Sequence, residues 1–494
     1  MHDELASGSG NDHASRLTAS RPLRALSDLP GPRGWPVFGN IPQIDVSRLH
    51  TILGAWAAEF GLVYRFRIGQ ADIVAIADTE LIHEILRDRP DGFRRFGAVR
   101  TLMLDVGIDG VFNAEGLAWR RQRKLTMHAL NTHHLLEFFE RLEQVTARLQ
   151  RRWERAAARG GRVDAKRDLM RFTVDVTSGL VFGHDLNTLE EEGDVIQRHL
   201  DKIFPALGRR ILAPVPYWRW FKLPADRKLD AAILEVHKLV NGLVAEARAR
   251  VAANAPEHAK SANLLDMMVA AQSDDAAGFT DAEIVGNTLT MLLAGEDTTA
   301  NTLAWMMHLM AEHPEVQEKM QAEADRVLSG AERPTDYASA QALHYIEAAA
   351  HEAMRLKPVA PIVGLETNAD TVIGDVRVPK GTRVYLLTGH AATMQSNFAD
   401  PQAFRPERWL AAADPGTCGH NTKAFAPFGG GARFCPGRHL AMLEIKLVAA
   451  MVCRNFEVAR APDSPPTEEV WGFTMMPKNA WVTLRRRGAD AASA

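Results

Sequence analysis

The stretch of this sequence most able to do chemistry is residues 428–437, where a cysteine follows a run of glycines and precedes Pro436. Glycines let the backbone turn tightly and approach a flat ligand where a Cβ would clash. Residues 440–452 show apolar helical spacing, which predicts that Cys435 lies just before a helix N-terminus. Amide N–H groups and the helix dipole favour a thiolate there, and a thiolate is a strong axial ligand for iron. Arg433 can bring a guanidinium to an anionic group nearby.

The cysteine alone has a simpler interpretation, because lone cysteines are usually small buried hydrophobes and glycine runs are usually loops. The whole string is more specific. It resembles the haem-ligand signature of the cytochrome P450 family, matched at Phe428, Gly431, Arg433, Cys435 and Gly437. The resemblance implies haem b with the Cys435 thiolate as its axial metal ligand, Phe428 and Gly437 beside the cofactor, and Arg433 at a haem propionate.

A long helix is predicted to begin at Thr280, because Thr280 and Glu283 have the form of a capping box. No proline follows until Pro314, so about 32 residues, or roughly 48 Å, can run unbroken. A glycine inside a helix costs about 1 kcal/mol relative to alanine, and acidic and hydroxyl side chains beside it compete for backbone hydrogen bonds. Residues 294–299 combine both features near the middle of the helix, which indicates a functional groove.

The same string resembles the Ala/Gly-Gly-x-Asp/Glu-Thr element of the cytochrome P450 family. The resemblance implies catalytic roles: Thr298 hydrogen-bonds the oxygen bound at the iron, and Asp297 helps deliver protons. The small Ala294 and Gly295 would leave room for O2 and substrate above the haem. The alternative is a surface cluster of polar residues that happens to follow a glycine.

Trp119 and Arg123 are four residues apart, so they share one face of a predicted helix. Both are hydrogen-bond donors, and they resemble the family's Trp-x-x-x-Arg element, which implies contacts with a haem propionate. A solvated basic face is the alternative. Arg120, Arg121 and Lys124 are expected to offer a positive patch to an acidic electron-transfer partner.

Glu352 and Arg355 are three residues apart on a predicted helix and can pair, although such pairs usually lie on the surface. With the Leu-x-Pro that follows, they resemble the family's buried Glu–Arg pair. Its third member would be Arg408, in a Phe-x-Pro-Glu-Arg-Trp string. The resemblance implies a structural network that locks the haem-binding loop against the core.

The sequence departs from the family pattern at two places. Leu365 and Glu366 stand where many members carry an arginine or histidine that holds a propionate, and Ala392-Thr393 replace a His-Arg pair. We therefore expect the propionates to depend on three residues: Trp119, Arg123 and Arg433.

The resemblance also places apolar residues from separate segments around a substrate. Residues 93–111 are expected as an irregular loop over it, residues 204–223 as a mobile lid, and residues 473–477 as the tip of a hairpin that reaches the pocket. Ordinary packing is the alternative for each. The expected substrate-pocket residues are Phe96, Leu102, Leu293, Val359, Ile362, Val363 and Met475.

Composition excludes several classes of protein. The 494 residues are 46% hydrophobic and 24% charged, and a formal net charge of −3 argues against a nucleic-acid binder. Three cysteines, Cys418, Cys435 and Cys453, build no disulfide framework, so a reducing cytoplasm is expected. No apolar run approaches the roughly 20 residues of a transmembrane anchor.

The expected fold is mostly α with a small β portion. Helical spacing covers residues 49–60, and alternating residues at 62–67 and 72–77 around Gly69-Gln70 predict a β-hairpin. We expect a disordered tail at 1–28, one cytochrome P450 domain at 29–487 and a C-terminal tail at 488–494. The family implies a long central helix over the haem and the cysteine loop beneath it.

The expected activity is monooxygenation: one oxygen atom of O2 enters an apolar molecule such as a fatty acid, terpenoid or steroid. Electrons are expected from a ferredoxin or flavodoxin with its NAD(P)H-dependent reductase, because the sequence has no flavin or iron–sulfur domain of its own. One alternative is a haem-thiolate peroxygenase or isomerase that needs no external electrons. Another is a haem-based binding or sensing protein without turnover.

Overall fold

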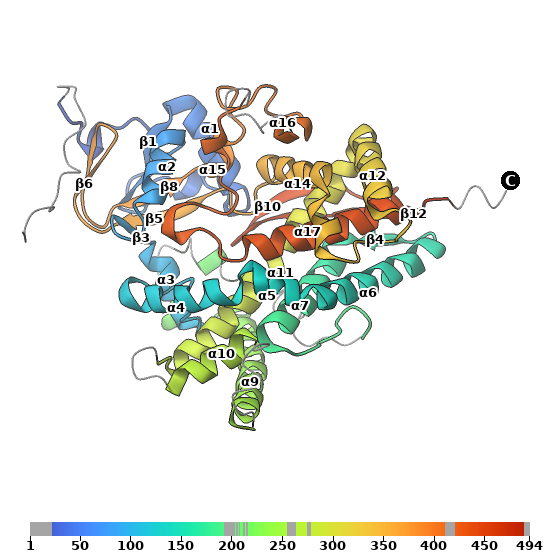
Figure 1. Ribbon diagram of the computed structural model, residues 1–494. Helices are drawn as coiled ribbons and strands as arrows, with labels where there is room; N and C mark the ends of the chain where they lie inside the picture. Colours follow the sequence, from blue (N-terminus) through green and yellow to red (C-terminus); the bar gives the residue numbers. More distant parts are fainter. Residues whose placement is uncertain are drawn as a thin grey trace, which may run out of the picture.

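The computed structural model describes residues 22–191, 203, 206, 208–210, 213, 216–253, 263–273, 278–410 and 420–488. This part of the chain is mostly helical with a small β portion, which confirms the predicted fold class. Figure 1 shows the largest sheet at one side of the molecule and the long helices filling the rest.

The described helices before the long central one are α1 (Leu49–Phe60), α2 (Thr79–Arg87), α3 (Gly97–Asp105), α4 (Gly116–Ala129), α5 (Thr132–Glu137), α6 (Phe139–Ala158), α7 (Ala165–Phe182), α9 (Pro224–Ala253) and α10 (Leu264–Ala270). The central helix and those after it are α11 (Asp281–Glu312), α12 (Pro314–Leu328), α13 (Tyr337–Gln341), α14 (His344–Leu356), α15 (Thr388–Ala391), α16 (Glu407–Leu410) and α17 (Arg438–Asn455).

The largest sheet has the strand order β1-β2-β8-β5-β3, in which β2 and β8 run parallel and the other neighbours antiparallel. Its strands are β1 (Val63–Ile68), β2 (Ala71–Ile76), β3 (Phe93–Arg95), β5 (Val363–Thr367) and β8 (Arg383–Leu386). A second sheet has the order β4-β12-β9, and β6-β7 and β10-β11 form hairpins. These strands are β4 (Arg162–Asp164), β6 (Thr371–Ile373), β7 (Val376–Val378), β9 (Phe456–Arg460), β10 (Glu468–Trp471), β11 (Met475–Lys478) and β12 (Trp481–Arg486).

Helix α11 belongs to two hydrophobic cores. Its apolar residues between Ile284 and Leu293 pack with α3, α4, α9 and α10, and those between Ala300 and Met310 pack with α6, α12, α14 and α17. The predicted capping box is present, since Thr280 and Glu283 bond each other's backbone amides. The helix runs its 32 residues without a break. Residues 294–299 therefore lie where the two cores meet.

Several predicted elements are confirmed. Helix α1 has the predicted bounds, β1 and β2 form the predicted hairpin, and Trp119 and Arg123 lie on α4. Residues 93–111 were wrongly expected to be irregular, because β3 pairs with β5 and is followed by α3.

Most of the expected tail at residues 1–28 lies outside the described residues, which begin at Pro22. Within it, Leu26–Asp28 form a 3-10 turn (η1), and Arg24 makes an ion pair with Asp375 at 2.7 Å. Ordered structure thus begins before residue 29. At the other end, Gly488 is the last residue described. Within the described chain, no helix is long and apolar enough to span a bilayer.

Candidate active site

The cysteine loop is closed by a backbone hydrogen bond from the Cys435 amide to the Phe428 carbonyl, at 2.8 Å. Gly431 lies in this loop with a φ of 62°, and a Cβ there would overlap the backbone carbonyl of Leu86 at the end of α2. Only glycine fits both the left-handed conformation and the close approach. Gly437 is the N-cap of α17, so Cys435 lies just before a helix N-terminus, as predicted.

The Cys435 thiol is held among opposing influences. Burial raises the pKa of the thiol above its usual value, and a hydrogen bond from the Gly437 backbone and the charges of Arg123 and Arg438 offset only part of this effect. Arg123 also donates to the carbonyl of Phe434 at 2.6 Å, and its guanidinium lies 4.6 Å from the centre of the Phe434 ring. The predicted cofactor residue Arg123 is therefore tied to the cysteine loop itself.

The middle of α11 carries the predicted catalytic pair. Ala294 is exposed although the residues around it on this helix are mostly buried, and Thr298 is half-buried. The Thr298 hydroxyl donates to the Ala294 carbonyl at 3.0 Å. Asp297 is buried and accepts a hydrogen bond from the Thr474 hydroxyl on the turn between β10 and β11. Thr474 was not anticipated from the sequence.

Gly295 has a different role from the one expected. A Cβ on this residue would overlap the side chain of Thr177 on α7. The glycine therefore allows the close packing of α11 on α7, and of the two small residues only Ala294 is exposed. A glycine required by a neighbouring helix cannot be told from one required by a ligand in a single sequence.

Arg433 and Trp119 are brought together as predicted. The Arg433 guanidinium lies 4.2 Å from the centre of the Trp119 ring and forms an ion pair with Glu115. Its Nε is buried and has no hydrogen-bond partner within the described structure. A buried donor of this kind is costly unless an acceptor meets it.

Two further arginines complete a cluster that sequence reasoning missed. Arg95 on β3 lies directly opposite Leu365 on β5, where the sequence lacks the expected cation. It donates from Nε to the Phe112 carbonyl at 2.9 Å. Arg89 is buried, and its Nε and one Nη have no partner among the described residues. The two consecutive arginines after Phe93 were visible in the sequence. Only the pairing of β3 with β5 shows that one of them lies opposite Leu365.

The cluster carries an excess of positive charge. Burial lowers the pKa of Arg95, and the charges of Arg89 and Arg433 lower it further, to about 9. Burial is also the main factor that lowers the pKa of Arg433, opposed by the carboxylate of Glu115. A bound anion would offset these unpaired charges. The donor set, the cysteine loop and the accessible Ala294 together fit a flat, dianionic, iron-bearing cofactor.

The buried network at Glu352 has the predicted members. The Glu352 carboxylate accepts from Arg355 at 2.8 and 2.9 Å, from Arg408 at 2.8 Å and from the Trp409 indole at 2.9 Å. Arg355 continues to the carbonyls of Ala392, Pro401 and Ala403. All three charged side chains are buried, so the pair is no surface pair.

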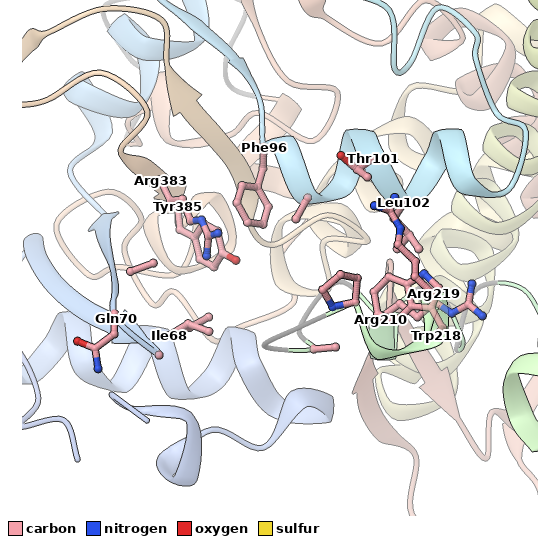
Figure 2. A pocket seen from close by; sticks show the side chains of 15 residues that line it. Ile68, Gln70, Phe96, Thr101, Leu102, Arg210, Trp218, Arg219, Arg383 and Tyr385 are labelled. Carbon is pink, nitrogen blue, oxygen red and sulfur yellow. The ribbon is translucent and has the colours of Figure 1, made fainter. Parts of the chain in front are cut away.

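The structure brings only some of the expected substrate-pocket residues together. Phe96 and Leu102 line a cavity of about 430 Å³, which Figure 2 shows from close by. Leu293 packs in the same core as Leu102. Met475 is buried, and its amide bonds the Val359 carbonyl at 2.8 Å, which brings the C-terminal hairpin to the segment after α14.

The remaining two expected residues, Ile362 and Val363, are half-buried and pack against the cores beside the largest sheet. Of the expected lid, residues 204–205, 207, 211–212 and 214–215 lie outside the described residues. Trp220 and Phe221 of that segment are exposed.

Comparison with known proteins agrees with this geometry. A model of the cytochrome P450 family matches residues 29–484. Human cytochrome P450 2W1 is 29% identical over 477 residues, covering 93% of this chain and 94% of that protein. The mitochondrial 25-hydroxyvitamin D-1 alpha hydroxylase of Rattus norvegicus is 27% identical over 493 residues, covering 94% and 95%. The chloroplastic Protein LUTEIN DEFICIENT 5 of Arabidopsis thaliana is 26% identical over 426 residues, covering 84% and 70%.

A cysteine held just before a helix N-terminus, with buried arginines that lack acceptors, fits a haem-thiolate oxidoreductase. The chain belongs to the cytochrome P450 family. It is a monooxygenase whose cofactor is haem b with a cysteine thiolate as axial ligand, and which uses O2 and electrons from redox partners.

Proposed function

We propose that this enzyme inserts one oxygen atom of O2 into an apolar organic molecule, with Cys435 as the axial ligand. The observation that carries the proposal is the closed loop that holds Cys435 before α17, beside buried arginine donors that lack acceptors. When bound, the haem supplies the oxidising chemistry, and a thiolate ligand favours O–O cleavage.

The residues around the cofactor then divide the remaining work. Arg433, Arg123 and Trp119 hold the propionates, with Arg95 and Arg89 in place of the cation missing at Leu365. Thr298, whose hydroxyl lies beside the exposed Ala294, would hydrogen-bond the bound oxygen, and the buried Asp297, which accepts a hydrogen bond from Thr474, would help deliver protons. The Glu352 network keeps the segment before the cysteine loop in place.

The test is the absorption spectrum of the reduced protein with carbon monoxide. We expect the long-wavelength Soret band of a thiolate ligand in the wild type and its loss in Cys435→Ser. A matched control is Cys453→Ser, since Cys453 is buried in α17 away from the loop. If the band persists in Cys435→Ser, the ligand assignment is wrong.

For the electron donor we propose a ferredoxin or flavodoxin with an NAD(P)H-dependent reductase. Lys124 and Arg438 are exposed, Arg438 as the first residue of the helix after the cysteine loop, and both support docking of an acidic protein; Arg120 is also exposed but pairs with Asp91 at 3.5 Å. Arg121 is not available for this, because it pairs with Glu283. Rates of reduction by each donor, at low and high salt, distinguish the two classes.

The domain limits and the compartment stay predictions. We propose one catalytic domain that reaches Arg487, which pairs with Asp325 at 2.8 Å, and that begins before residue 29. The cytoplasmic location rests on the cysteine content alone, and the relatives' names include mitochondrial and chloroplastic proteins. Cell fractionation tests it directly.

A further inference from the structure

The cavity of about 430 Å³ lies between the β1–β2 turn, Arg383 and Tyr385 of β8, α3, and the described residues Arg210, Ala213, Pro216, Trp218 and Arg219. Figure 2 shows Arg383 and Tyr385 on one side of it, Arg210, Trp218 and Arg219 on the other, and Phe96 between. Its walls thus combine aromatic surface with three arginines.

The three arginines differ in what neutralises them. Arg210 is buried and bonds the buried Asp226 through two nitrogens, at 2.9 and 3.1 Å. Arg219 pairs with Asp105 at 2.7 Å. The Arg383 side chain has neither an ion pair nor a hydrogen bond within the described part of the chain, and its guanidinium lies 4.5 Å from the centre of the Phe96 ring.

The neighbours of Arg383 do not compensate its charge. Glu366 lies directly opposite it on β5, but its carboxylate is engaged by Arg94 and by the Gly97 amide. Tyr385 projects from the same face of β8 two residues on. Burial raises the pKa of Tyr385 to about 12, so its hydroxyl is a donor at neutral pH.

The cavity has an apolar part beside its charged one, because Phe96, Leu102 and Trp218 line it. Leu102 lines it and belongs to the same hydrophobic core as Leu293, which directly precedes the accessible Ala294. A molecule anchored at Arg383 by one end can therefore lay an apolar body against the aromatic and aliphatic side chains that line the cavity. A ligand that fits this cavity therefore has an anionic group at one end and an apolar body.

We propose that the cavity binds the carboxylate of an apolar organic acid, with Arg383 as its ion-pair partner and Tyr385 as a second donor. This inference rests on the proposed monooxygenase function and narrows its substrate class to acids oxidised away from the carboxyl end. Planar guanidinium groups bind carboxylates with two parallel hydrogen bonds, and an aromatic ring behind the group orients it.

The first test needs no variant. Saturated fatty acids and the primary alcohols of the same chain length are titrated into the haem-loaded enzyme, and the spin-state shift of the Soret band gives each Kd. We expect the acid to bind about tenfold more tightly than its alcohol at low salt, and the advantage to shrink at high salt. Equal affinities would overturn the inference.

Two variants test whether Arg383 is the cation that binds the carboxylate. Arg383→Gln is expected to weaken dodecanoic acid about tenfold and to leave dodecan-1-ol unchanged. Arg219→Ala is the matched control, because it removes a cavity arginine already paired with Asp105, and it should change neither ligand by more than about twofold. Equal loss in both variants, or equal loss of acid and alcohol in Arg383→Gln, would contradict the assignment.

The carbon monoxide spectrum separates this inference from the proposed function. A variant that keeps the thiolate band has an intact haem site, so a missing preference for acids refutes the carboxylate site alone. Absence of the band in the wild type refutes the proposed function itself.

Discussion

Removal of the Glu352 carboxylate would leave two buried guanidinium groups without their common counter-ion. In the native protein the carboxylate bonds Arg355 and Arg408, the amide of Arg405 at 3.1 Å and the indole of Trp409. Glu352→Ala removes the common acceptor of all these hydrogen bonds at once. The other carbonyl contacts of Arg355 and Arg408 remain, but they carry no full negative charge.

The expected cost follows from burial. Breaking a buried ion pair by removing one partner costs about 3–5 kcal/mol, because an uncompensated charge stays in the interior. For a domain of about 460 residues, the entropy of unfolding is about 1 kcal/mol per degree, so about 4 kcal/mol corresponds to about 4 °C in Tm. Glu407→Ala is the control. Glu407 pairs with Lys319 at the surface, and its loss should cost at most about 1 kcal/mol.

The assay is thermal unfolding of the haem-loaded protein, followed by circular dichroism at several pH values. Burial raises the pKa of Glu352, but Arg355 and Arg408 lower it more, so the net pKa lies below 4.5. Its stabilising contribution is therefore complete above pH 4.5 and is lost as the pH falls through the lower folded-state pKa. The difference between wild type and Glu352→Ala should narrow below pH 4.5. Equal shifts for the two variants at neutral pH would refute the reasoning.

Three further predictions concern the site. Thr298→Ala should lower the product formed per NADPH (the coupling) by about tenfold, with O2 still consumed and peroxide released. Thr298→Ser should retain the coupling. Unchanged coupling in Thr298→Ala would favour the peroxygenase alternative. Gly431→Ala should abolish haem incorporation, because the added Cβ would overlap backbone atoms of Leu86. At Gly429 the space is open but φ is 70°, so Gly429→Ala should lower the stability by only about 1 kcal/mol and keep the haem. The haem bound per protein is measured for both variants. Gly295→Ala should destabilise the protein by about 1–3 kcal/mol, and Thr177→Ala in the same chain should restore most of it; a purely additive double variant would contradict the proposed contact.

Local patterns in the sequence predicted much of the fold. The capping box at Thr280, the proline at 314 and the hairpin turn at Gly69-Gln70 act within a few residues, so they predict the bounds of α11 and the β1–β2 hairpin well. The helix face shared by Trp119 and Arg123 is equally local.

Contacts between distant segments were beyond such patterns. Arg95 lies opposite Leu365 only because β3 pairs with β5, some 270 residues later in the chain, and this same pairing turned an expected loop into a strand. Gly295 was assigned to the ligand because the sequence does not show Thr177 on the neighbouring helix. Thr474 reaches Asp297 through the fold of the C-terminal hairpin.

Helix α11 has one end in each of two separately packed hydrophobic cores, and the proposed catalytic residues lie between them. Side chains in the interior shared with α3, α9 and α10 can change size or shape without disturbing the packing behind the cysteine. The proposed site therefore predicts that substrate specificity can change by repacking this half of the molecule, while Thr298, Asp297 and Cys435 keep their surroundings.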